Sequence, residues 1–374
     1  MLPPPDAPDA RADRRRPRWL TRSGTAVLVL VCLVALSFVV PAQWLGRVVP
    51  GHAMIDDPTV AQKPGSARAT NARVEISAAD VDDPDGAILF TTVALDSTIT
   101  VFDWLRSEFD DDIVLRPRVE VLGTRSIEEN RERNLEMMRV SKDGAVVTAL
   151  EYLGFDVIDE TGVAFESVID DGPAHEILEP GDVIVAIDGD PVTSVTSLLD
   201  ILATKVPGDV GVITVDNIDT GEIRDAELTW GENPEREGAF IGIANVVPRQ
   251  EELPLPFDVS IDSGNIGGPS AGLAFTLTII DLLTEGDLTG GQNVAVTGTI
   301  EPGGNVGNVG GVGQKAAAAH EAGAVAFVVP VESVEIAEEH ARDMPIIGVE
   351  TLEEALDALA SLGGDTTDLT LVSG

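Results

Sequence analysis

One serine and one lysine stand in sequence surroundings that suit chemistry. Ser270 lies in the segment GNIGGPSAGLAF (residues 264–275), where glycines and Pro269 surround the hydroxyl and an apolar helix is expected to follow. Glycine permits backbone conformations that other residues avoid and lets another molecule approach the main chain closely. The segment therefore presents Ser270 to a partner, although Pro269 and Ser270 would also suit the plain start of a buried helix.

Lys315 is the lysine whose surroundings disfavour a charge. It follows the glycine-rich segment GNVGNVGGVGQ and opens the helix expected from QKAAAAHEAG. An ammonium there faces the positive end of the helix dipole, and the alanines that follow offer no carboxylate. An apolar site lowers the pKa of a lysine, and an amine with a pKa of about 7 to 8 accepts a proton near neutrality. Because a serine hydroxyl needs such a base, the sequence predicts a Ser270–Lys315 catalytic dyad.

Histidine is the alternative base, but a Ser/His/Asp triad is the weaker hypothesis. None of the four histidines has glycine-rich surroundings; they are His52, His175, His320 and His340. No HExxH motif, cysteine cluster or EF-hand spacing occurs, so neither a metal site nor a cofactor is predicted. Acidic runs such as Asp110 to Asp112 are expected to be solvated.

Residues from about 239 to 363 resemble the proteolytic domain of Lon proteases. The serine motif GPSAG spans Gly268 to Gly272, and the lysine motif appears as Thr297-Gly298 followed by GGVGQK, which ends at Lys315. The resemblance implies that Ser270 and Lys315 are catalytic and that Thr297, 18 residues before the lysine, positions it.

The same resemblance implies roles for the main chain around the serine. Gly268, Pro269 and Gly272 would shape the loop, and amides from Gly268 to Ser270 would stabilise an oxyanion. Lon-type domains commonly form rings, so a homo-oligomer is implied. Two positions depart from the family pattern. Gly267 stands three residues before the serine in place of an acid, and Thr299 follows Thr-Gly in place of glutamate.

A second resemblance covers about 80 residues and points to a PDZ domain. It rests on a Tyr-Leu-Gly-Phe loop, on Gly172-Pro173-Ala174, and on the block PGDVIVAIDG that begins at Pro180. In that family, loop N–H groups hold the terminal carboxylate of a peptide that adds as a strand. The resemblance assigns this to Tyr152, Leu153, Gly154 and Phe155. The alternative is that Leu153 and Phe155 are core residues of a strand start.

The charge of the chain limits its partners. Its 374 residues carry a formal net charge of −40, which would repel nucleic acid. Residues 1–24 differ, since they hold six arginines and three acids. The following uncharged run, 25–42, suits one transmembrane helix with a cytoplasmic N-terminus and an extracytoplasmic catalytic part. A cleaved signal peptide is the alternative, because Val40-Pro41-Ala42 resembles a cleavage site.

We therefore expect a multidomain α/β (α+β) chain in which strands and helices alternate toward the C-terminus. The expected parts are a cytoplasmic basic tail (1–24), a transmembrane helix (25–42), a tether (43–70), an N-terminal α/β region (71–150), a PDZ-like domain (151–232), a Lon-type proteolytic domain (235–363) and a C-terminal tail (364–374). This order resembles the membrane-anchored PDZ and Lon domain proteins of bacteria.

The predicted function is that of a membrane-anchored serine endopeptidase. The sequence has no GxxxxGK[ST] loop, so we expect cleavage without ATP of unfolded or misfolded extracytoplasmic proteins. The PDZ domain would recruit or gate these substrates. One alternative is a non-catalytic PDZ membrane adaptor whose Lon-like part is an assembly platform. Another is an enzyme that releases itself from the membrane by autoprocessing.

Overall fold

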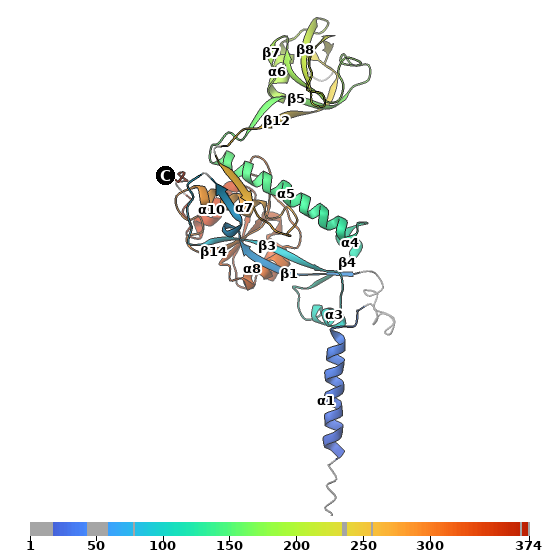
Figure 1. Ribbon diagram of the computed structural model, residues 1–374, viewed down its shortest axis with the longest axis vertical. Helices are drawn as coiled ribbons and strands as arrows, with labels where there is room; N and C mark the ends of the chain where they lie inside the picture. Colours follow the sequence, from blue (N-terminus) through green and yellow to red (C-terminus); the bar gives the residue numbers. More distant parts are fainter. Residues whose placement is uncertain are drawn as a thin grey trace, which may run out of the picture. The chain divides into compact units, whose positions relative to one another are not determined.

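The computed structural model describes residues 18–42, 59–77, 79–233, 238–255, 257–366 and 369–372. Most of the predicted basic tail (1–17), much of the predicted tether (43–58) and His52 lie outside the described residues. The chain forms two compact units (Figure 1). The described residues of the first lie within 18–75, 81–145 and 261–372, and those of the second lie within 76–80 and 146–260.

A six-stranded mixed sheet forms the centre of the first unit, in the order β18-β17-β14-β3-β1-β4. Four strands run parallel: β3 (Ala87–Asp96), β14 (Asn293–Val296), β17 (Ala326–Pro330) and β18 (Ile346–Val349). β1 (Thr59–Ala69) pairs antiparallel with β3 and with β4 (Val114–Pro117). β17 is buried along its whole length, as expected for a parallel strand covered on both faces.

Helices surround this sheet. They are α3 (Val101–Ser107), α4 (Arg118–Leu122), α5 (Ile127–Tyr152), α7 (Gly272–Leu283), α8 (Val312–Glu321), α9 (Val334–His340) and α10 (Leu352–Ser361), with short turns η2 (Asn71–Arg73) and η3 (Val331–Ser333). Every residue of α7 is buried, including the polar Thr276, Thr278 and Asp281, and most of its other side chains are apolar. A hairpin of β15 (Thr299–Ile300) and β16 (Val306–Gly307) follows β14.

The boundaries predicted for the first part of the chain are wrong. Residues 59–69 of the expected tether form β1, which pairs with β3 and β4 in the main sheet. The sequence concealed this strand because Pro64 and Gly65 interrupt it, and the β1–β3 register shifts between Pro64 and Ala67. The region 71–150 is also not a separate domain, since β3 pairs with β14. β4 ends at Pro117, which is the N-cap residue of α4.

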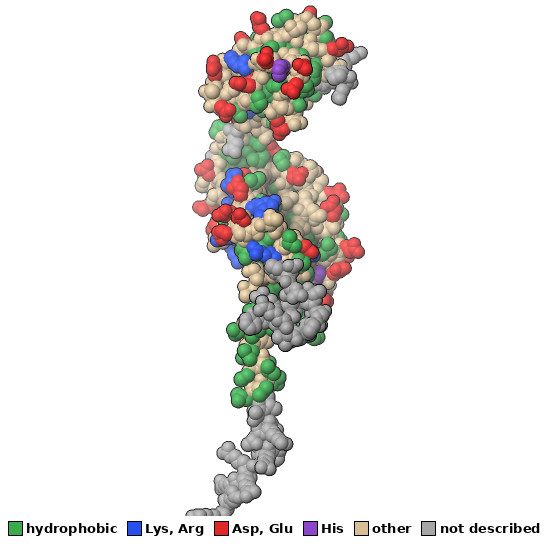
Figure 2. Space-filling view, turned by 90° about the vertical axis from the view of Figure 1, so that its right-hand side faces the viewer, with side chains coloured by type: hydrophobic (Ala, Val, Ile, Leu, Met, Phe, Trp, Pro, Cys, Tyr) green, Lys and Arg blue, Asp and Glu red, His purple; other side chains and the backbone are tan. Residues whose placement is uncertain are grey.

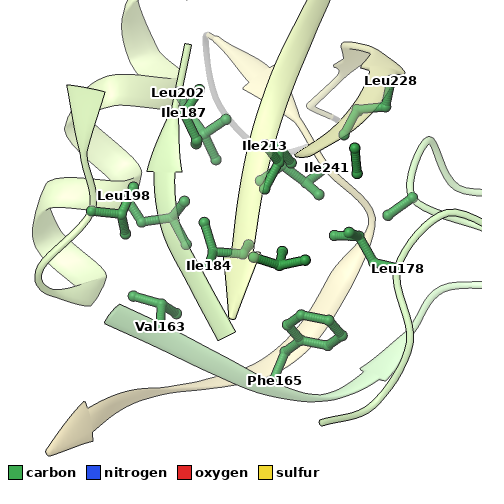
Figure 3. Packing of buried hydrophobic residues seen from close by; sticks show 14 of the residues in the cluster. Val163, Phe165, Leu178, Ile184, Ile187, Leu198, Leu202, Ile213, Leu228 and Ile241 are labelled. Atoms are coloured by element: carbon green, nitrogen blue, oxygen red, sulfur yellow. The ribbon is translucent and has the colours of Figure 1, made fainter. Parts of the chain in front are cut away.

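The second unit is a β-rich fold around one apolar core. Its sheet has the order β12-β5-β6-β8-β9, built from β5 (Ile158–Val168), β6 (Asp182–Ile187), β8 (Val210–Asn217), β9 (Ile223–Thr229) and β12 (Ile243–Glu252), with β7 (Asp190–Pro191) on β6. α6 (Val195–Thr204) covers it, and β10 (Gly231–Glu232) pairs with β11 (Ala239–Phe240). Figure 3 shows side chains from β5, β6, β8 and α6 meeting in this core.

Two expectations for this unit need correction. β12 lies inside the span predicted for the Lon-type domain (235–363), but it pairs along β5 and completes this sheet instead. Residues 172–174, expected to start a helix, form turns, with Ala174 N–H bonded to the carbonyl of Ile241. Where the chain passes between the units, the short strands β2 (Val74–Ser77) and β13 (Asp258–Ile261) pair with each other.

Helix α1 (Arg18–Ser37) overlaps the predicted transmembrane span, but it begins among arginines and ends before Ala42. Its apolar side chains from Val27 to Leu36 are largely exposed, and Cys32 is exposed among them. In the portion of the chain that the structure describes, no helix combines the length and the apolar character that crossing a membrane requires.

Candidate active site

Ser270 lies in the loop that enters α7 and does not cap that helix. The helix begins at Gly272, its N-cap position is occupied by Ala271, and no side chain caps it. Gly268 takes a φ of +96°, a conformation that glycine adopts without strain. Among the described residues, the Ser270 hydroxyl has no hydrogen-bond partner. The plain helix-start interpretation therefore does not account for this serine.

Helix α5 holds the serine loop in place. The N–H of Gly268 donates to the carbonyl of Asn134 at 2.7 Å, and the hydroxyl of Ser141 donates to the carbonyl of Pro269 at 2.9 Å. Both contacts fix main-chain atoms directly before Ser270. Nothing in the sequence of residues 127–152 predicts this contact with the serine loop, because Asn134 and Ser141 lie among charged residues.

Two glycines allow α5 to approach this closely. A Cβ on Gly267 would lie 2.8 Å from atoms of Asn134, and a Cβ on Gly272 would lie 2.9 Å from the Ser141 hydroxyl and 3.1 Å from Ile300. The acid that the Lon pattern places at position 267 would therefore collide with α5. The departure at Gly267 is explained by this packing.

Thr297 connects the serine loop to Lys315. It follows β14 directly, is fully buried, and accepts a hydrogen bond from Lys315 Nζ at 3.0 Å. Its own hydroxyl donates to the carbonyl of Ser270 at 3.1 Å, and the next N–H, from Gly298, donates to the same carbonyl at 3.1 Å. The structure thus brings together Ser270, Thr297 and Lys315, the three residues that the sequence selected.

Lys315 is buried in the first turns of α8, with 3% of its surface exposed. Burial lowers the pKa of its amine to about 7. Among the described residues, no carboxylate forms an ion pair with it, and Thr297 is its side-chain partner. Since a buried amine without a counter-ion favours the neutral form, Lys315 can accept a proton near neutral pH.

Ser270 and Lys315 both line one cleft of about 790 Å³. Its walls come from β1, β3, α5, the serine loop and the glycine-rich loop before α8. Gly311 in that loop takes a φ of +68°, and a Cβ there would lie 2.6 Å from Val93. The cleft is large enough for several residues of an extended peptide.

The main-chain donors near the serine differ from those predicted. The N–H of Gly268 is already bonded to Asn134, and Pro269 has no N–H. Gly272 donates to the carbonyl of Pro269 at 3.3 Å. Within the described part of the chain, the N–H groups of Ser270 and Ala271 have no acceptor, so these two are the available oxyanion donors.

Among the described residues of the first unit, no histidine lines the cleft beside Ser270. His340 Nδ1 lies 2.7 Å from a carboxylate oxygen of Asp112, and Arg342 binds the other oxygen. Neither His340 nor Asp112 lines the cleft. Asp112 is buried, so the expectation that it is solvated was wrong. The pair packs against α8, because the His340 ring lies where a Cβ of Gly313 would be.

The Tyr152–Phe155 loop uses its N–H groups inside the chain. Leu153 donates to the carbonyl of Ala149, Gly154 to Glu151, and Phe155 to Leu150. With Gly154 at a φ of +86°, these bonds form a Schellman cap that closes α5. A peptide carboxylate cannot use donors that are already occupied, so the predicted carboxylate-binding role is not compatible with this structure. The loop N–H groups are occupied because they cap α5, and the resemblance in sequence did not reveal this.

Two family models match the chain. Residues 258–361 match the Lon protease (S16) C-terminal proteolytic domain, and residues 151–222 match the PDZ domain. The chain combines a PDZ domain with a Lon-type proteolytic domain. The Lon-type match contains Ser270, Thr297 and Lys315, whereas β1, β3 and most of α5, which complete the cleft, lie before it.

Similar solved structures are PDZ domains. They include that of the SdrC-like protein Lmo2051 from Listeria monocytogenes and that of the SdrC-like protein Lin2157 from Listeria innocua. Both are 30% identical to this chain, and both matches cover 22% of this chain with a TM-score of 0.21. The match covers 85% of the Lmo2051 structure and 91% of the Lin2157 structure. No curated protein matches the chain.

Proposed function

We propose that this protein is a serine endopeptidase that works without ATP through a Ser270–Lys315 dyad. The observation that carries the proposal is the chain of contacts from the buried Lys315 amine, through the Thr297 hydroxyl, to the Ser270 carbonyl. These hydrogen bonds connect the residue that supplies the base to the residue that supplies the nucleophile, and both residues line one cleft. They also give the threonine of the Lon motif a positioning role.

In the proposed mechanism, Ser270 Oγ attacks the scissile carbonyl carbon while its proton passes to the neutral amine of Lys315. The N–H groups of Ser270 and Ala271 stabilise the negative carbonyl oxygen. As the C–N bond breaks, the ammonium returns the proton to the leaving amine and an ester remains on Ser270. Water, deprotonated by the same amine, then hydrolyses the ester and restores the enzyme.

The test compares degradation of unfolded casein by the full chain and by Ser270→Ala and Lys315→Ala variants. The unchanged chain is expected to produce fragments, and neither of these two variants is. Lys205→Ala is the matched control and should cleave like the unchanged chain, because Lys205 is a largely buried lysine of the PDZ unit that pairs with Asp188 at 2.8 Å. Equal cleavage by the three chains, or cleavage by none, would contradict the proposal and favour a non-catalytic adaptor.

We propose that the PDZ domain recruits or gates unfolded substrates without the Tyr152–Phe155 loop as a carboxylate site. This follows from the loop N–H groups that cap α5. An unfolded substrate with a free C-terminal carboxylate and the same substrate with an amidated C-terminus should therefore be cleaved equally fast. A strong preference for a free C-terminal carboxylate would contradict this part of the proposal.

We further propose that the catalytic unit acts outside the cytoplasm, on a chain anchored through residues 25–42. The support is the uncharged 18-residue run beside an arginine-rich segment and the exposed apolar side chains of α1. Membrane fractionation and protease accessibility of intact cells test this location. Recovery of the full-length chain in the soluble fraction would contradict it. Assembly into a ring is a further proposal, to be tested by the mass of the detergent-solubilised protein.

A further inference from the structure

The cleft beside Ser270 differs in charge from the rest of the protein. Asp and Glu make up 64 of 374 residues, so a lining of 31 residues would contain about five at the average composition. The lining contains none. Its basic side chains are Arg68, Arg131, Arg133 and the catalytic candidate Lys315, in a chain with 24 basic residues. In Figure 2, acidic side chains are spread widely, whereas most basic side chains in view lie close together on the lower of the two units.

The three arginines come from two walls of the cleft. Arg68 lies on β1, opposite Phe90 of β3, and its Nε donates to the Ser66 hydroxyl at 2.9 Å. Arg131 and Arg133 lie on α5, the helix that also holds the serine loop. The two arginines are two positions apart and so do not lie one above the other on the helix, but both line the cleft, together with their neighbours Asn130 and Asn134.

Few of the positive charges are neutralised within the protein. Arg133 forms no ion pair or side-chain hydrogen bond with any described residue. Arg131 lies 3.7 Å from Glu128, but both side chains are more than half exposed, so this pair is weak. Arg139, on the same helix and outside the cleft, shows the contrast, because Glu136 and Asp143 both pair with it. The cleft arginines are thus available to a ligand.

Apolar side chains fill the remaining wall. Leu95, Leu135, Met137 and Met138 line the cleft together with the arginines. Unbranched methionine side chains adapt to different apolar partners. The cleft therefore combines adaptable apolar contacts with several cationic groups, which fits a peptide that carries both apolar and acidic side chains.

We propose that the cleft selects peptide segments that carry acidic side chains within a few residues of the scissile bond, next to an apolar residue. This inference rests on the proposed peptidase function and names its substrate class. The net negative charge of the chain does not oppose such a substrate at short range, because charges beyond about 10 Å are largely screened at about 0.1 M salt. Single-stranded nucleic acid would also meet the arginines, but a long polyanion extends beyond the cleft to the acidic surface.

Binding to the Ser270→Ala form of the full chain tests the proposal without requiring turnover. The probes are fluorescent peptides of one apolar sequence with flanking Asp, Asn or Lys, measured by anisotropy at about 0.1 M salt. Exposed charge pairs contribute about 0.2 to 1 kcal/mol each. The Asp peptide should therefore bind about 1.4- to fivefold more tightly than the Asn peptide for each arginine engaged, and the Lys peptide more weakly than either.

Arginine variants in the same background identify the source of the preference. Arg131→Gln with Arg133→Gln should remove most of it, and Arg139→Gln should leave it unchanged. Equal binding of the Asp and Asn peptides, a preference that survives the double variant, or tighter binding of a single-stranded oligonucleotide than of the Asp peptide would overturn the inference. Because the casein comparison tests the peptidase function separately, the two proposals can fail independently.

Discussion

The most informative single substitution is Thr297→Val, which keeps the shape of the side chain and removes its hydroxyl. Thr297 accepts from Lys315 Nζ at 3.0 Å and donates to the Ser270 carbonyl at 3.1 Å. Loss of the acceptor leaves a buried N–H donor unpaired, at a cost of about 1 to 3 kcal/mol. If the amine must recover its position in the transition state, kcat/KM falls roughly 5- to 150-fold.

The same substitution has a second consequence for the pH profile. A hydroxyl oxygen stabilises an ammonium more than a neutral amine, so its loss lowers the pKa of Lys315 further below about 7. The acidic limb of kcat/KM, measured with a fluorogenic peptide, should therefore move to lower pH. Thr297→Ser retains the hydroxyl and should restore both the rate and the limb. A Thr297→Val enzyme with the original rate and the original limb would refute the reasoning.

Three further predictions concern stability. Burial raises the pKa of Asp281 to about 7 despite the hydrogen bond from Leu288. The folded chain therefore keeps a proton that the unfolded chain releases near pH 3.8, the ordinary pKa of an aspartate. The free energy of unfolding should then fall by about 4 kcal/mol as pH rises from about 4 to about 7, and Asp281→Asn should flatten this slope in urea titrations. Gly313→Ala places a Cβ 2.5 Å from the His340 ring, so it should lower stability by about 1 to 3 kcal/mol and reduce casein cleavage; unchanged thermal unfolding would contradict this. Burial opposes ionisation of Asp112, but hydrogen bonds from His340 and Arg342 hold the pKa of Asp112 below its usual value. Asp112→Asn should therefore cost about 1 to 3 kcal/mol at neutral pH. The cost should shrink as pH falls below about 4, first because the unfolded carboxylate takes up a proton and then, at lower pH, because the native carboxylate does.

The chemistry of the site was predictable because few residue types fit it. A lysine between glycines and alanines has no neighbouring carboxylate that would favour a charged amine. The structure places Lys315 in the buried start of α8, beside Thr297. The strands β14 and β17 and the helix α7 are also recognisable in the sequence, since each is a predominantly apolar run bounded by glycine or polar residues.

The supporting wall of the site could not be predicted from the sequence. β1 is interrupted by Pro64 and Gly65, and its partners are distant along the chain, so no local pattern revealed it. The contacts of Asn134 and Ser141 with the serine loop join residues more than a hundred positions apart. Gly267 was the one local sign of this approach, because it departs from the family pattern where α5 leaves no space for a side chain.

The loop Tyr152–Phe155 shows how a motif can mislead. Its sequence resembles the carboxylate-binding loop of a PDZ domain. The same Leu-Gly-Phe sequence also suits a helix end, with glycine in the left-handed conformation. The helix that precedes it decided the outcome, because α5 continues to Tyr152 and its last carbonyls take the loop N–H groups.

The central claim is that the Lys315 amine is neutral near physiological pH and activates Ser270. The most direct measurement is the rate at which a neutral fluorophosphonate modifies Ser270, followed from about pH 5 to about pH 10 and located by mass spectrometry. The rate should rise with an apparent pKa near 7, the pKa to which burial lowers Lys315, and Lys315→Met should abolish the rise. A rate that increases only toward 10.5, the ordinary pKa of a lysine, or that is the same in Lys315→Met, would contradict the account.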